Sequence, residues 1–211
     1  MAADPTGFEA LLQEGAAITY GDDPHTISRH DVGVLVMPTG SVWAGDPLTA
    51  ATYRTRPFTV GVDPGRYRIV AVMADNAARG PSWQVPAALQ LVVRDEAVAT
   101  WEPAQWPGLK PTNVEDVLNG YPVDSGTGCF ADVTAGFDLA TTEDDTVGET
   151  IQIQLHGKSW TMFELDTETK ANVAVMTTGG DGVFGTWVGR TTTGEVACFL
   201  TSFGVVGTRE G

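Results

Sequence analysis

At 211 residues the chain is long enough to bury a sizeable core as one β-rich domain, without disulfide or metal staples. It carries 27 Asp and Glu against 12 Lys and Arg, and the resulting formal charge of −15 repels nucleic-acid backbones. We therefore expect no nucleic-acid partner, and a soluble protein whose field attracts basic protein surfaces. The 25 glycines and the 18% share of charged residues indicate short strands joined by tight turns.

The first 30 residues are predicted to form a helix and a lead-in loop. Phe8, Leu11 and Leu12 share helical spacing, which predicts a short amphipathic helix. The N-terminus lacks the basic and apolar regions of a signal peptide, and no stretch approaches about 18 apolar residues. We therefore expect no membrane span and a cytoplasmic protein, with a single β-rich domain over residues 31–211.

Two hairpins are predicted at the start of that domain. Residues 32–37 (VGVLVM) are apolar throughout, as in a strand buried on both faces, and a Pro-Thr-Gly turn leads into residues 41–44, which end at Asp46. Apolar residues alternate over 58–62 and, after an Asp-Pro-Gly-Arg turn, over 67–73. This alternation on both sides of a turn predicts the second hairpin.

Residues 102–121 differ in sequence pattern from the segments around them, because Pro and Gly interrupt every candidate helix or strand. They are expected to form an ordered loop with at most one helical turn, around residues 114–118. Trp101 and Trp106 flank this loop and could form a recognition surface. Packing into the core is the alternative role for these side chains.

The remaining runs complete a mainly β fold. Alternating or apolar residues predict further strands at 87–93, 97–101, 151–155, 172–176, 184–188 and 196–203. The last two are joined by the turn-like sequence RTTTGE, which predicts a C-terminal hairpin. About ten strands at this spacing indicate an antiparallel β-sandwich or a partly open barrel with a short N-terminal helix.

Familiar cofactor and metal signatures are missing from the sequence. Cys129 and Cys198 each lie beside Phe in an apolar run, which favours two buried free thiols over a disulfide. The three histidines have no Cys or His partner at a metal-binding spacing. The Gly-Gly-Asp-Gly sequence at 179–182 lacks the Gly-Lys-Ser/Thr that completes a phosphate loop. We predict no cofactor and no metal site.

Asp, Gly and Pro recur together at the ends of the apolar runs. The motifs are Gly45-Asp46-Pro47, Pro57-Phe58, Pro64-Gly65 with Tyr67, Val123-Asp124 with Gly126, Phe130 and Asp132, and Gly180-Asp181-Gly182 followed by Trp187, Gly189, Gly194-Glu195 and Phe203. This ordered set, over residues 40–203, resembles the DUF4241 family of bacterial proteins of uncharacterised function. Ser202 departs from the acidic residue that the family carries before its last Phe, so no role for that acid transfers.

Two functions remain open. The first is a soluble acidic binding protein that engages or neutralises a basic protein partner, with Asp46, Trp101 and Trp106 as candidate binding residues. Because the sequence carries no known catalytic signature, this function is favoured over an enzymatic one.

The alternative is a small hydrolase built from Asp124, Asp132 and Asp181, whose carboxylates would act as general acid and base if they converge. A glycine-rich loop lies between the first two, but their spacing is not that of an EF-hand. Each of these residues equally suits a turn or a strand end, where Asp bonds the neighbouring backbone.

Overall fold

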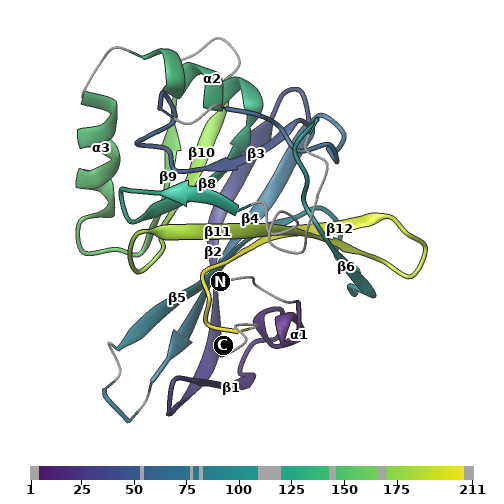
Figure 1. The fold of residues 1–211 in the computed structure, drawn as a ribbon, viewed down its shortest axis with the longest axis vertical. Helices are drawn as coiled ribbons and strands as arrows, with labels where there is room; N and C mark the ends of the chain where they lie inside the picture. Colours follow the sequence, from purple (N-terminus) through teal and green to yellow (C-terminus); the bar gives the residue numbers. More distant parts are fainter. Residues whose placement is uncertain are drawn as a thin grey trace.

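The structure is a computed structural model, and it describes residues 5–52, 55–76, 78–80, 83–108, 120–142, 146–165 and 170–206. Over these ranges the protein is mainly β: its strands form two antiparallel sheets, and a short helix, α1 (Phe8–Leu11), precedes them (Figure 1). The predicted fold class is therefore confirmed. No helix within the described ranges is long and apolar enough to cross a membrane.

The larger sheet contains most of the strands. In spatial order they are β1 (Ala17–Tyr20), β2 (Asp23–Met37), β4 (Gly65–Asp75), β5 (Gln84–Val92), β12 (Val196–Ser202), β11 (Gly182–Arg190) and β6 (Thr100–Pro103), and β7 (Gly120–Val123) pairs with the first half of β11. Strand β2 continues through residues 30 and 31, and its register against β4 shifts between Asp31 and Gly33.

The smaller sheet has the order β3 (Val42–Gly45), β8 (Thr127–Asp132), β10 (Asn172–Thr177) and β9 (Trp160–Glu164). Two helices, α2 (Val133–Thr141) and α3 (Thr146–Leu155), lie beside this sheet at the top left of Figure 1. Their buried side chains, among them Leu139 and Ile151, pack against its outer face.

Alternation along β4 places the main core between the two sheets. Ile69, Ala71 and Met73 face inward, where they meet Phe130 and other side chains of the smaller sheet. The residues between them, such as Val72, face the opposite side and are covered by α1 and the C-terminal segment. The order of layers is thus helices, small sheet, large sheet and α1.

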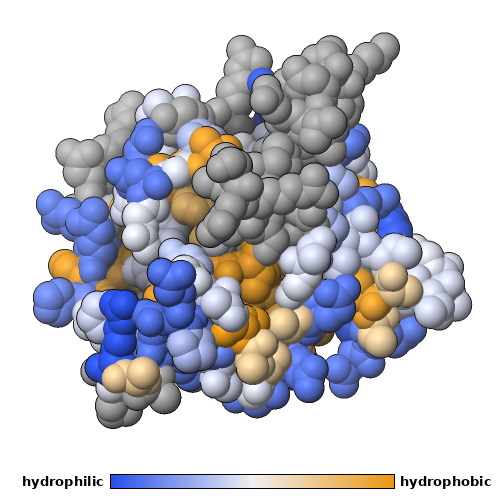
Figure 2. All heavy atoms as spheres, turned by 60° about the horizontal axis from the view of Figure 1, so that its bottom comes forward, coloured by the Kyte–Doolittle hydropathy of each residue, from blue (hydrophilic) through white to orange (hydrophobic). Residues whose placement is uncertain are grey.

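The surface is largely polar. In Figure 2, which brings the bottom of Figure 1 forward, hydrophilic residues surround apolar groups near the centre of the face. Within the described ranges, the large apolar side chains that stay exposed are Tyr20, Val34, Trp83, Phe137, Ile153 and Val183. They come from separate elements, as is usual for a protein surface.

The two predicted N-terminal hairpins are wrong. Strand β4 pairs with β2 and β5, and residues 58–62 form no strand; the backbone N–H of Val62 instead donates to Gly40 O. Strand β3 leaves the larger sheet altogether and pairs with β8. The predicted C-terminal hairpin is confirmed, because β11 and β12 pair from Thr186–Thr201 to Arg190–Val196. Alternation specifies which face of a strand is buried but does not choose its partner.

The strand predicted at residues 151–155 is also wrong, since these residues end helix α3. Ile151 and Leu155 are buried on one side, whereas Ile153 is 72% exposed, and an i, i+4 pair on one face is the helical pattern. Helix α2 was not predicted. The helical turn predicted around residues 114–118 lies outside the described residues.

Candidate functional site

The Asp46 side chain joins the end of β3 to the turn between β7 and β8. Its Oδ2 accepts the backbone N–H groups of Asp124 and Ser125, both at 3.0 Å. Its Oδ1 accepts the Ser125 hydroxyl at 2.7 Å and the Leu48 N–H at 2.9 Å. Asp46 is 3% exposed, so these four bonds replace its hydration. The carboxylate fixes where the 124–126 turn lies.

Asp132, at the other end of β8, likewise accepts backbone N–H groups from separate segments. It is fully buried and caps helix α2, accepting the Thr134 N–H at 3.0 Å on Oδ1. Its Oδ2 accepts the N–H groups of Thr39 at 2.9 Å and Gly40 at 3.0 Å, and the two threonine hydroxyls add further bonds. About 17 Å of extended strand separates Asp132 from Thr127, the first residue of β8. The structure therefore does not bring Asp132 together with Asp124.

Asp124 and Asp181, in contrast, come together. Strand β7 pairs with β11, and the last pair of this ladder is Val123 with Gly182. The next residue outward on each strand is an aspartate, and both are exposed. The two turns are also linked directly, because the Thr178 N–H donates to Gly126 O at 2.9 Å. One end of the molecule thus presents two acidic residues in neighbouring positions.

A cavity of about 300 Å³ opens beside Asp46. Its lining includes Trp43, Arg56, Trp106 and Tyr121, of which only Trp106 was singled out from the sequence. Trp106 stacks on Phe58 with ring centroids 5.9 Å apart. An aromatic-lined cavity of this size with a few polar groups is the usual form of a small binding site. The sequence signal that could have pointed to this cavity is Arg56, directly before Pro57-Phe58.

Tyr121 lines this cavity, but its hydroxyl lies in the core, beside Gly128 of β8. Among the described residues it makes no hydrogen bond of normal geometry, and the Thr201 hydroxyl only partly offsets its burial. Burial raises the pKa of the Tyr121 phenol well above its usual value, so it stays protonated. The Tyr121 hydroxyl is therefore a protonated group of the core, out of reach of a ligand in the cavity.

Comparison with known proteins gives a family. A family model described as a protein of unknown function, DUF4241, matches residues 35–201. The chain belongs to the DUF4241 family. No curated protein and no solved structure matches it. The match includes β3, β8, β10 and most of the larger sheet, so the two buried aspartates of this DUF4241 protein lie inside the family region.

The candidate binding residues of the DUF4241 protein fall into two places. Asp46 and Trp106 line the same cavity. Trp101 lies elsewhere, against α1, where its ring meets that of Phe8 edge-to-face at 5.2 Å. The two tryptophans therefore do not form one recognition surface.

Both cysteines are free and buried, as predicted. Burial, followed by the nearby Asp46 charge, raises the pKa of the Cys129 thiol well above its usual value. Burial likewise raises the pKa of Cys198 to about 11. Neither thiol is a nucleophile at neutral pH, because the reactive species is the thiolate. In the described ranges, no group of three or more His, Cys, Asp or Glu residues is placed to hold a metal ion.

Proposed function

We propose that this DUF4241 protein is a cytoplasmic binding protein that engages a basic partner protein through the end of the molecule carrying Asp124 and Asp181. The observation that carries the proposal is the pairing of β7 with β11, which puts two exposed aspartates in neighbouring positions. Asp46 and the Thr178–Gly126 bond hold both turns in place. A preorganised surface loses little conformational entropy when a partner binds.

The surroundings of this acidic pair suit a protein partner. Val183, the second residue of β11, lies two residues after Asp181 and is 64% exposed. A partner Lys or Arg could place its charged end at the aspartates and its methylene stem along Val183. The net charge of −15 would accelerate the encounter.

A hydrolase built from Asp124, Asp132 and Asp181 has less support. Asp132 is remote from the other two, and its oxygens accept bonds from Thr39, Gly40 and Thr134. A general acid or base must lie within hydrogen-bond reach of the proton that it moves. The binding function uses only groups that are exposed.

The proposal is tested by measuring binding to a Lys/Arg-rich peptide and to a set of basic proteins, with acidic proteins of similar size as negative controls. Asp124→Asn/Asp181→Asn should weaken binding at least about tenfold, in line with the loss of close charge pairs at an interface. A control with the same change in net charge is Asp22→Asn/Asp63→Asn, which removes two exposed aspartates from other turns. The control should stay within about twofold of the unmodified protein.

Two results would count against the proposed function. One is equal weakening by the test and control pairs, which would mean that binding follows net charge alone. The other is the absence of any preference for basic over acidic proteins at about 50 mM salt, where surface electrostatics are strong.

A further inference from the structure

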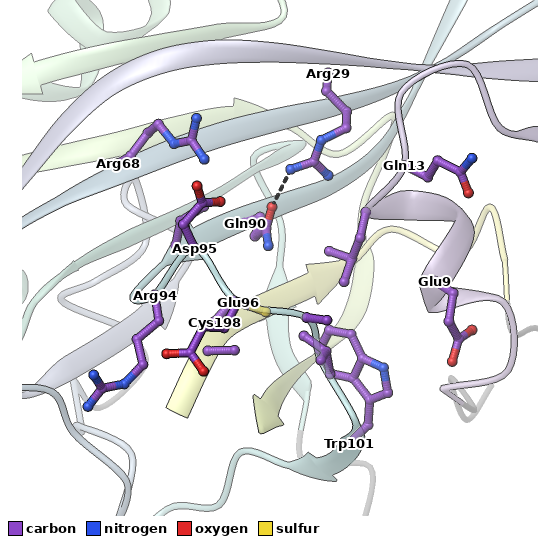
Figure 3. Close-up of a pocket in the computed structure, with 15 residues that line it drawn as sticks. Glu9, Gln13, Arg29, Arg68, Gln90, Arg94, Asp95, Glu96, Trp101 and Cys198 are labelled. Atoms are coloured by element: carbon purple, nitrogen blue, oxygen red, sulfur yellow. Dashed lines mark hydrogen bonds between the residues drawn. The ribbon is translucent and has the colours of Figure 1, made fainter. Parts of the chain in front are cut away.

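A second cavity, of about 430 Å³, lies on the face of the larger sheet that α1 covers only in part. Strands β2, β4, β5 and β12 are neighbours here, and Arg29, Arg68, Gln90 and Cys198 line the cavity from them (Figure 3). Where α1 ends, the apolar side chains of this face give way to polar ones. The cavity thus lies on the part of this sheet face that α1 does not cover.

Arg29 is held rigidly in this cavity by neutral partners. Its Nη1 donates to the backbone oxygen of Leu11 at 2.5 Å, and its Nη2 donates to Gln90 Oε1 at 2.7 Å. Neither partner carries a charge, so the guanidinium is oriented but not neutralised. A guanidinium has five N–H donors, and these two bonds use two of them.

Arg68 gives the cavity a second guanidinium. In the described part of the chain, no carboxylate lies within ion-pair distance of the side chain of Arg29 or Arg68. Burial, followed by the nearby charge of Arg68, lowers the pKa of Arg29. The charge of Glu14, whose Oε2 accepts the backbone N–H of Arg29, acts in the opposite direction and raises this pKa. Two guanidiniums without a direct ion pair can still take an anion, because charge-assisted hydrogen bonds to a guanidinium are strong. Arg94 differs, because it pairs with Glu195 at 2.5 Å.

The walls of the cavity restrict the kind of anion. Trp101, Val92 and Leu12 supply an apolar side, which suits an organic group. Glu9, Asp95 and Glu96 also line the cavity and would repel a ligand of high negative charge. A single negative charge on an apolar body fits both features.

We propose that this cavity binds a small organic carboxylate, whose carboxylate group lies against Arg29 and Arg68 and whose apolar part lies along Trp101. Planar carboxylates match the fork of a guanidinium and accept two parallel hydrogen bonds from it. None of the lining residues belongs to the turns that carry Asp124 and Asp181, so this site is independent of the proposed protein-binding surface.

The test uses phenylacetate as the probe, with benzyl alcohol as its neutral counterpart and inorganic phosphate as a more highly charged one. Binding is followed by calorimetry and by NMR shifts of the Gln90 and Cys198 amides. Phenylacetate should bind saturably, with a Kd of about 1 mM or tighter, and the other two should bind at least about tenfold more weakly. The shifts should be confined to the strands that line the cavity.

Variants locate the binding group. Arg68→Gln should weaken phenylacetate binding about tenfold through loss of a charge-assisted pair. Arg66→Gln is the matched control, because Arg66 is exposed on the same strand but does not line the cavity. It should change binding by less than about twofold. Asp95→Asn should tighten binding, since it removes a like charge from the wall.

Three outcomes would overturn the inference. The first is no saturable phenylacetate binding up to about 20 mM, a concentration far above the expected Kd. The second is an unchanged affinity for phenylacetate in Arg68→Gln. The third is phosphate binding as tight as that of phenylacetate. The last result would retain an anion site but reject the carboxylate. Because Arg68 is exposed, its replacement is not expected to unfold the protein.

Discussion

The sharpest prediction concerns Asp132→Asn, which keeps the size of the side chain but removes one acceptor oxygen and the charge. In the native protein Oδ1 accepts the Thr134 N–H, and Oδ2 accepts the N–H groups of Thr39 and Gly40. Asn is as good a helix cap as Asp, so its carbonyl can keep the bond to Thr134. Its NH₂ group then faces two backbone donors that have lost their acceptor.

The magnitude follows from burial. Asp132 is 0% exposed, so water cannot replace the missing acceptor. Each buried unsatisfied N–H costs about 1–3 kcal/mol, and the lost charge assistance adds to this. We therefore expect the free energy of unfolding to fall by about 3–5 kcal/mol, a large part of the total of about 5–15 kcal/mol that is typical of a domain.

The assay is urea unfolding followed by far-UV circular dichroism, with the free energy obtained from the midpoint and the m-value. Asp181→Asn is the control, since Asp181 is exposed, and it should change the free energy by no more than about 0.5 kcal/mol. A loss of less than about 1 kcal/mol in Asp132→Asn would refute the structural role that the geometry gives to this carboxylate.

Two further predictions concern the backbone and alkaline pH. Gly40 has φ +72°, and a Cβ there would lie only 1.9 Å from the backbone oxygen of Val62; Gly40→Ala should therefore cost more than about 3 kcal/mol in thermal or urea unfolding. Gly15→Ala, at φ +75° in open space, should cost only the about 1–2 kcal/mol of the left-handed conformation, and equal costs would contradict the predicted steric clash. The unfolded Cys198 thiol ionises above about pH 8.5, while in the folded protein its pKa is raised to about 11 by burial. The folded state then holds a proton that the unfolded state releases, so between about pH 9 and 11 the free energy of unfolding should fall by about 1.4 kcal/mol per pH unit from this group. Urea titrations of the native protein and of Cys198→Ala should differ in this slope, and identical slopes would contradict the prediction.

Local patterns in the sequence predicted those elements whose partners are close along the chain. The helix at Phe8 and Leu11 and the β11–β12 hairpin needed only spacing and a turn signal. Strand β4 was found from its alternation, but its pairing with β2 was not, because the choice of partner depends on packing across the whole sheet. Helix α3 was missed because a short alternation outweighed the longer spacing of Val147, Ile151 and Leu155.

The candidate site also combines features that follow from the local sequence with features that depend on contacts between distant segments. The sequence singled out Asp46, Asp124 and Asp181 as residues beside turns, and all three do lie beside turns. That Asp46 is bonded to the 124–126 turn depends on contacts between segments 78 residues apart. The arginine-lined cavity could not be foreseen, since Arg29 and Arg68 come together only once β2 and β4 have paired.

The strand order of the larger sheet also bears on how the chain folds as it leaves the ribosome. Strands β1, β2, β4 and β5 are spatial neighbours in chain order, so they can pair while the rest is still being synthesised. The next position belongs to β12, the last strand that the structure describes. Until β12 arrives, β5 presents an unpaired edge to other nascent chains. The protein is thus most exposed to misassembly during the translation of its second half.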